Sequence, residues 1–131
     1  MSTGVIDTSV FIAQESGRGL QAVRLPDEGY VTVITLAELE AGVLSAQDAD
    51  ARAARLLTYQ ALADVDLLTV DPGAAHEWAR LRYKLALAGR RVNVNDLWIA
   101  AIASARGLPV YTQDDDFDAI SAEGGPEVIH V

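Results

Sequence analysis

The sequence predicts a three-layer α/β protein, in which helices cover both faces of a central parallel sheet of four to five strands. Segments typical of strands alternate along the chain with segments typical of helices. The strand segments are short and apolar on both faces, which is typical of a parallel sheet covered on each side. The length of 131 residues suits a single domain spanning residues 1–131.

Local signals justify the elements of the first half. We predict a strand over 3–7, because this segment is β-branched and ends in a polar turn, and a helix over 9–16, which two glycines end. A β-branched run predicts the second strand over 30–34. Helices are predicted next over 36–45 and over 47–64, the second of them rich in Ala, Leu and Arg.

The second half continues the alternation. An apolar run predicts a strand over 65–70, and Pro72 opens a helix that extends to about Ala88. Asn93–Asn95 open another helix, which Gly107 ends. The remaining predicted elements are a strand over 108–112, a short helix over 114–120 and a last strand over 127–131.

Composition excludes several kinds of chemistry. The chain has no cysteine, which rules out disulfides, thiolate catalysis and cysteine-ligated zinc. Its two histidines, His76 and His130, have no third histidine nearby, and no G-x-S-x-G stretch predicts a serine hydrolase. The N-terminus does not resemble a signal peptide, and no apolar run approaches the roughly 20 residues of a membrane span. We therefore expect a soluble cytoplasmic protein without membrane contact.

The charge is strongly negative but unevenly distributed. The formal net charge of −9 argues against a nucleic-acid binder when taken alone. Half of the basic residues nevertheless lie close together in the chain: Arg80, Arg82, Lys84, Arg90 and Arg91. This stretch has two interpretations that the sequence does not separate, a phosphate-binding face or an ordinary solvated helix face.

Acidic residues follow several of the predicted strands. Asp7 ends the first strand, Glu38 follows the second, and the run Asp114–Asp116 follows the fourth, while Asp96 lies in the first turn of a helix. Ligands of open parallel sheets bind at the carboxyl ends of the strands, which meet at one edge. We therefore expect these carboxylates to converge, although they are far apart in the sequence.

Each acid also has a structural interpretation. Thr35 and Glu38 have the spacing of a capping box, and Asp96 has the position that complements a helix dipole. Asp114 is a possible N-cap of the last helix, and Asp7 a possible start of an Asx-turn. Taken together, these interpretations lose weight, because carboxylates about 4 Å apart repel by roughly 4 kcal/mol per pair at a dielectric constant near 20. Gathered oxygen ligands indicate a hard cation such as Mg²⁺ or Mn²⁺.

At these residues the sequence resembles the PIN-domain ribonucleases and, within them, the VapC-type toxins of bacterial toxin–antitoxin pairs. Four segments match the family's motifs in the right order: 5–10 (VIDTSV), 35–39 (TLAEL), 95–101 (NDLWIAA) and 112–117 (TQDDDF). The match extends over essentially the whole chain. The resemblance implies a flavodoxin-like parallel sheet, Mg²⁺-dependent cleavage of RNA, and inhibition by a cognate antitoxin.

The resemblance also assigns roles residue by residue. It makes Asp7 and Asp96 the main metal ligands, and it places Glu38 in the same acidic cluster. It adds Asp114 or Asp116, or both, because many relatives keep only one of these two acids. Ser9 and Thr112 would be hydroxyls that orient a carboxylate or a metal-bound water. Apart from the resemblance, we expect Arg or Lys side chains of the 80–91 stretch to hold flanking phosphates.

Other classes fit less well. A haloacid-dehalogenase-like phosphatase requires a second aspartate where this chain has Ser9, and a response regulator requires paired acids beside the first strand. The stronger rival is a PIN-like module that only binds a protein partner, although the acids of all four motifs are intact.

Apolar and aromatic residues indicate protein contacts. The helices predicted over 47–64 and 72–88 have surplus apolar faces, which favours homodimerisation and antitoxin docking. For the aromatic side chains Tyr59, Trp78, Tyr83 and Trp98, the helical spacing favours packing in the core or in a dimer over base stacking. The sequence does not name the RNA target.

Overall fold

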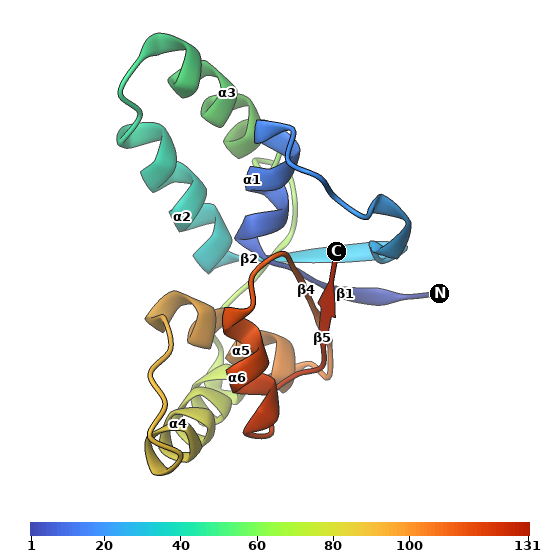
Figure 1. Cartoon of the computed structure of the whole chain (residues 1–131), viewed down its shortest axis with the longest axis vertical. Coiled ribbons are helices and arrows are strands. Elements are labelled where there is room, and N and C mark those ends of the chain that lie inside the picture. Colours follow the sequence, from blue (N-terminus) through green and yellow to red (C-terminus); the bar gives the residue numbers. More distant parts are fainter.

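A five-stranded, all-parallel sheet forms the centre of the molecule, and helices cover both of its faces (Figure 1). The computed structural model describes all residues, 1–131. The strands are β1 (Thr3–Ile6), β2 (Glu28–Thr32), β3 (Leu67–Leu68), β4 (Val110–Thr112) and β5 (Val128–His130). The helices are α1 (Thr8–Ser16), α2 (Val33–Leu44), α3 (Ala49–Gln60), α4 (Pro72–Leu87), α5 (Val94–Ala105) and α6 (Asp116–Ala122). The predicted fold class is confirmed.

Neighbouring residues of the central strands are buried on opposite faces. Val5 of β1 pairs with Val110 of β4, and both belong to a buried cluster with Leu81 of α4. The next pair in register, Ile6 and Tyr111, belongs to a second cluster on the other face. The two-sided burial explains why these strands are apolar throughout.

The order of the strands is β3-β2-β1-β4-β5. The chain builds from β1 outward to β3, and then returns to place β4 on the other side of β1. The strand order therefore reverses between β1 and β4, and such a switch point forms a crevice at the carboxyl ends of the strands. Asp7 and Gln113 are the first residues beyond β1 and β4, so both lie at this crevice.

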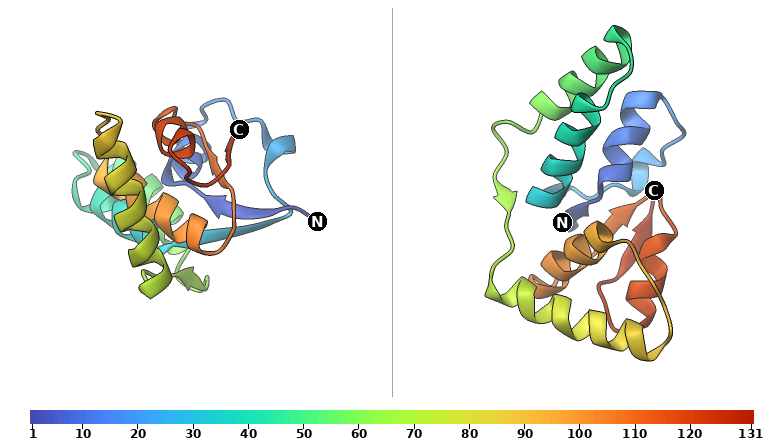
Figure 2. Two further views of the ribbon diagram at one scale, coloured as in Figure 1. Left: turned by 90° about the horizontal axis from the view of Figure 1, so that it is seen from below. Right: turned by 90° about the vertical axis from the view of Figure 1, so that its left-hand side faces the viewer.

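The helices form two groups, one on each face of the sheet (Figures 1 and 2). The α2 and α3 helices pack against each other as a hairpin on one face, and α4 packs against α5 on the other. None of these helices combines the length and the apolar character that a membrane crossing needs.

Some predicted boundaries are wrong. The strand predicted over 65–70 has only the residues Leu67–Leu68, and Val65 and Val70 on either side are exposed. A short 3₁₀ helix, Ala22–Arg24, lies in a stretch where no element was predicted. The helix predicted from 36 begins at Val33, because the Thr32 hydroxyl accepts a hydrogen bond from the Thr35 amide at 3.3 Å and caps it there.

Candidate active site

Asp7 is held at the end of β1 by hydrogen bonds that all reach one carboxylate oxygen. Its Oδ2 atom accepts from the hydroxyl of Ser9 at 2.7 Å, the hydroxyl of Thr112 at 2.9 Å and the Ser9 amide at 3.3 Å. The last of these bonds makes Asp7 the N-cap of α1. Only 2% of the residue is exposed. The carboxylate is therefore fixed in place, and its Oδ1 atom accepts no hydrogen bond from the rest of the chain.

The two hydroxyls are themselves fixed by the loop after β4. The Ser9 hydroxyl accepts a hydrogen bond from the Gln113 amide at 3.0 Å, and the Thr112 hydroxyl accepts one from the Asp114 amide at 2.9 Å. Each hydroxyl thus has its proton directed at Asp7. Burial raises the pKa of Asp7, and the bonds from Ser9 and Thr112 oppose this rise.

Asp96 lies in the first turn of α5, and Asn93 caps this helix by accepting from the amides of Asn95 and Asp96. Asp96 is 9% exposed, and no hydrogen bond from the rest of the chain reaches its carboxylate. Burial and the surrounding carboxylates raise its pKa to about 7. The carboxylates that contribute, in order of effect, are those of Asp7, Glu38, Asp116 and Asp114. The negative groups predicted to converge therefore do act on one buried position.

Glu38 is positioned by a residue that the sequence analysis missed. The Thr8 hydroxyl donates to Glu38 Oε1 at 2.7 Å and lies 2.9 Å from the Thr35 hydroxyl. The capping-box interpretation of Thr35 and Glu38 is wrong, because the N-cap of α2 is Thr32. Thr8 lies between Asp7 and Ser9, the two residues of the first motif to which the resemblance assigns roles. The motif therefore gave no signal for Thr8.

The three aspartates that follow β4, residues 114–116, differ in burial. Asp114 is partly buried, and its pKa is raised first by burial and then by Asp7 and Asp116, while Arg18 opposes the rise. Asp116 is exposed at the start of α6. The interpretation of Asp114 as the N-cap of the last helix is wrong, because α6 begins two residues later, and the residue at its N-cap, Asp115, makes no side-chain capping bond.

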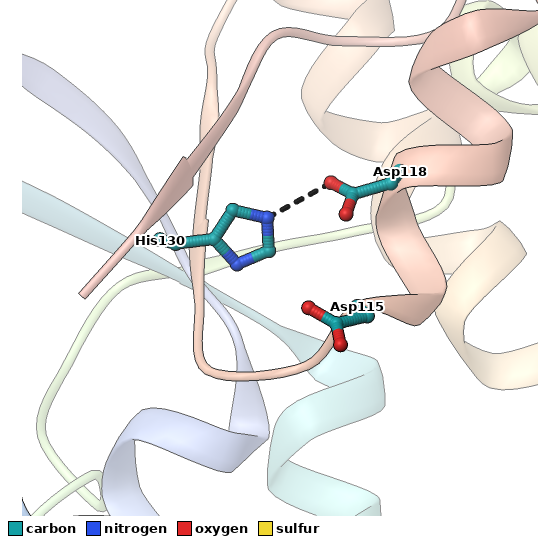
Figure 3. A group of neighbouring side chains, drawn as sticks. All are labelled: Asp115, Asp118 and His130. Carbon is teal, nitrogen blue, oxygen red and sulfur yellow. Dashed lines mark hydrogen bonds and ion pairs between the residues drawn. The ribbon is translucent and has the colours of Figure 1, made fainter.

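The one compact group of potential metal-ligating side chains lies beside these acids. It consists of Asp115, Asp118 and His130, whose ligand atoms all lie within 4.8 Å of one another, and His130 Nε2 is 2.9 Å from Asp118 Oδ1 (Figure 3). Both acids of this group are exposed. No three of the predicted site acids are this close together, so they interact through their charge rather than as a tight cage.

Of the five basic residues between 80 and 91, two lie near Gly124 and three have no partner within the chain. Arg80 is bound within the molecule, to Glu77 at 2.7 Å and to the carbonyl oxygen of Gly124 at 2.9 Å. Lys84 lies beside Gly124 in a separate hollow. The other three basic residues make no ion pair or side-chain hydrogen bond, and they are Arg82, Arg90 and Arg91.

The donor set of the site fits a hard divalent cation. Asp7, Asp96 and Glu38 form no ion pair with a basic side chain, so their charge is not balanced within the chain. The free atoms are carboxylate oxygens, the ligands that Mg²⁺ and Mn²⁺ prefer. Mg²⁺ commonly uses one or two carboxylates and keeps several waters, which suits acids that are near each other without forming a tight cage.

Comparison with known proteins agrees with this arrangement. Residues 4–123 match the PIN domain family. Ribonuclease VapC5 of Mycobacterium tuberculosis is 56% identical over 99% of this chain and 96% of its own length. The chain belongs to the PIN-domain family and, within it, to the VapC ribonucleases. The family predicted from the sequence is thereby confirmed.

Two further matches support the family over most of the chain. Ribonuclease VapC4 of the same organism is 45% identical over 87% of this chain and 88% of its own length. The crystal structure of VapBC-5, a toxin–antitoxin system of M. tuberculosis, matches with a TM-score of 0.87 and 53% identity, covering 100% of this chain and 98% of the other. The fold of this VapC-family chain therefore agrees with that of a solved relative along its whole length.

Proposed function

We propose that this chain is a Mg²⁺-dependent endoribonuclease and the toxin of a VapBC-type toxin–antitoxin pair. The observation that carries the proposal is a buried carboxylate, Asp96, that has no hydrogen-bond partner and is surrounded by other acids. A bound divalent cation would balance the negative charge of this carboxylate. The ribonuclease names of VapC5 and VapC4 support RNA as the substrate.

In this proposal the acids have different roles. Asp7 and Asp96 would hold the cation. Bound there, Mg²⁺ supplies a lowered pKa for the attacking water and stabilises the leaving oxygen of the phosphodiester. Glu38 or Asp114 accepts the proton of the attacking water, and Thr8 keeps Glu38 oriented by its 2.7 Å hydrogen bond.

Asp114 and Asp116 complete the acidic edge from the loop after β4. The charges of both acids raise the pKa of Asp96. We propose that both acids contribute to the site.

We also propose that RNA phosphates contact the unpaired arginines. Arg90 and Arg91 line a groove of about 290 Å³ that also contains the carboxylates of Asp115, Asp116 and Asp118. Arg82 lies farther along the same side of the molecule. Arg80 and Lys84 are weaker candidates, since Arg80 is engaged by Glu77 and Lys84 lies in a different hollow.

An antitoxin and a second copy of the chain are the proposed protein partners. The similar solved structure is described as a VapBC toxin–antitoxin system, which supports an antitoxin. Leu44 and Leu57 on the α2–α3 hairpin and Leu87 on α4 are 76%, 71% and 71% exposed, so apolar surface is available for both contacts. Insertion of an antitoxin arginine at the acidic edge would displace the metal, and a purified complex with full nuclease activity would contradict that step.

The function is tested by cleavage of structured RNA in the presence of Mg²⁺. We expect Asp7→Asn and Asp96→Asn each to lower the rate by at least about a hundredfold, because each removes a ligand charge. Asp64→Asn is the matched control, since this aspartate is exposed and lies outside the four motifs and the groove. Variants that cut as fast as the wild type would contradict the mechanism. Binding of Mg²⁺ by the wild type without cleavage of any RNA would favour the non-catalytic module.

A further inference from the structure

A pocket of about 800 Å³ lies between α4, the loop after it and the start of α5. This volume falls within the usual range of ligand sites, about 300–1,000 Å³. The residues on which the following argument depends are Trp78, Arg82, Tyr83, Arg90, Arg91 and Leu97. The wall thus combines aromatic rings with guanidinium groups.

The cations of this pocket are free to bind a ligand. Arg82, Arg90 and Arg91 form no ion pair or side-chain hydrogen bond within the chain. The chain as a whole has a formal charge of −9, so most of its surface repels a polyanion. Three unpaired arginines at one pocket make this wall a place where a nucleic acid strand can approach.

The two aromatic rings of the wall differ in their contacts: the Trp78 ring packs on another ring, and the Tyr83 ring is exposed. Trp78 stacks on Trp98, with ring centroids 5.0 Å apart and planes inclined by 19°. The Arg82 guanidinium lies 5.8 Å from the centre of the Trp78 ring. Tyr83 is 65% exposed, so its ring is available for stacking.

The pocket adjoins a groove that contains Asp116. The groove that contains Asp116 shares Arg90, Arg91 and Val92 with the pocket wall. Asp116 is one of the carboxylates that raise the pKa of Asp96. A strand that places a phosphate at the acids can therefore pass along the two arginines and reach the pocket.

We propose that this pocket holds an unstacked nucleobase of single-stranded RNA beside the cleavage site, with Tyr83 and Arg82 as stacking surfaces and Arg90 and Arg91 as phosphate contacts. The proposal rests on the proposed ribonuclease function and adds a binding site for one base next to the cleaved bond. A paired base cannot enter, because its faces are covered by its neighbours in the helix.

The test measures binding of a short single-stranded oligoribonucleotide that contains one 2-aminopurine, using the full chain with Asp7→Asn to prevent cleavage. We expect the 2-aminopurine fluorescence to be quenched on binding. Adding Tyr83→Ala should weaken binding by roughly five- to a hundredfold and relieve the quenching, whereas Tyr83→Phe should preserve both. Arg82→Ala should also weaken binding. Arg52→Ala on α3 is the matched control, because Arg52 is equally exposed and lies at the other end of the molecule.

Two outcomes overturn the pocket proposal. In the first, the Tyr83→Ala and Arg82→Ala variants bind the oligoribonucleotide as tightly as the Arg52→Ala variant does. In the second, the protein binds fully paired RNA as tightly as the single strand. Cleavage by the wild-type chain is measured in parallel with Mg²⁺. If the wild type cleaves while the pocket variants bind normally, the pocket proposal fails and the proposed function stands. If the pocket variants weaken binding but the wild type cleaves no RNA, the proposed function fails and the binding site stands.

Discussion

Asp7 and Asp96 are both buried at the same edge of the sheet, yet the chain supports them in opposite ways. Asp7 receives three hydrogen bonds on Oδ2, from groups that the loop after β4 holds in place. The carboxylate of Asp96 receives none, and the neighbouring acids disfavour its charged form. The difference teaches that hydrogen bonds within the fold hold Asp7 in place, whereas the charge of Asp96 is balanced only when a counter-ion binds.

Among variants that keep both aspartates, the largest expected effect comes from removing the hydroxyl groups that hold Asp7. The double change Ser9→Ala with Thr112→Val deletes both hydroxyl donors to Oδ2. We expect RNA cleavage to fall by roughly 10- to 100-fold, because loss of groups that orient a metal ligand commonly has this effect. The single change Thr112→Ser retains a hydroxyl and should retain most of the rate. A double variant with wild-type cleavage would show that Asp7 needs no such support.

The two aspartates should affect stability with opposite signs in metal-free protein. Asp7→Ala leaves three donors without their acceptor and removes the N-cap of α1, so the free energy of unfolding should fall by roughly 1–3 kcal/mol. Asp96→Asn removes a buried, repelled charge and should raise it at neutral pH by roughly 1–2 kcal/mol. Urea denaturation in EDTA measures both values. Destabilisation by Asp96→Asn would contradict the proposed difference between the residues.

The pH dependence sharpens the same comparison. The pKa of Asp96 is about 7 in the folded protein, against a reference value of 3.8. The folded state therefore binds the proton more tightly than the unfolded chain, so the contribution to stability is complete below about pH 4 and is lost as the pH rises through about 7. The stability advantage of Asp96→Asn should accordingly be small near pH 4 and largest above about pH 7. Saturating Mg²⁺ should reduce it, and an advantage independent of pH would contradict the assignment to this carboxyl group.

The smallest effects on cleavage are expected in the acidic run Asp114–Asp116, which lies near both Asp7 and Asp96. Asp114→Asn should lower cleavage more than Asp116→Asn, because Asp114 is partly buried and acts on Asp7, while Asp116 is exposed. Asp115→Asn, at an exposed position between them, is the control and should stay within about twofold of the wild type. A ranking with Asp115 as the most sensitive residue would instead direct attention to its group with Asp118 and His130.

The sequence was sufficient for the fold class and the family, because the alternation of strands and helices and the order of the four motifs can be read directly from it. It was insufficient for the supports of the acids. Glu38 has the spacing of a capping box, and only the position of Thr8, thirty residues earlier in the chain, shows which group binds it. The start of α2 at Val33 was missed for a similar reason, since Thr32 and Thr35 are both good N-caps and tertiary packing decides between them.

The basic stretch shows the same limit. Arg80 and Arg82 are two residues apart and are equivalent by composition. The structure binds Arg80 to Glu77 and leaves Arg82 over Trp78 without an ion pair. Which charges are available to a ligand depends on neighbours that a single sequence does not reveal.

The hydrogen bond from Thr112 to Asp7 has a consequence for the timing of synthesis. It joins the first strand of the chain to the fourth, across 105 residues. A nascent chain that has not yet released its last strands lacks both Thr112 and the amides that align the hydroxyls. A growing toxin therefore cannot assemble this half of its site while most of it is still being made, and the complete edge forms only when the chain is nearly finished.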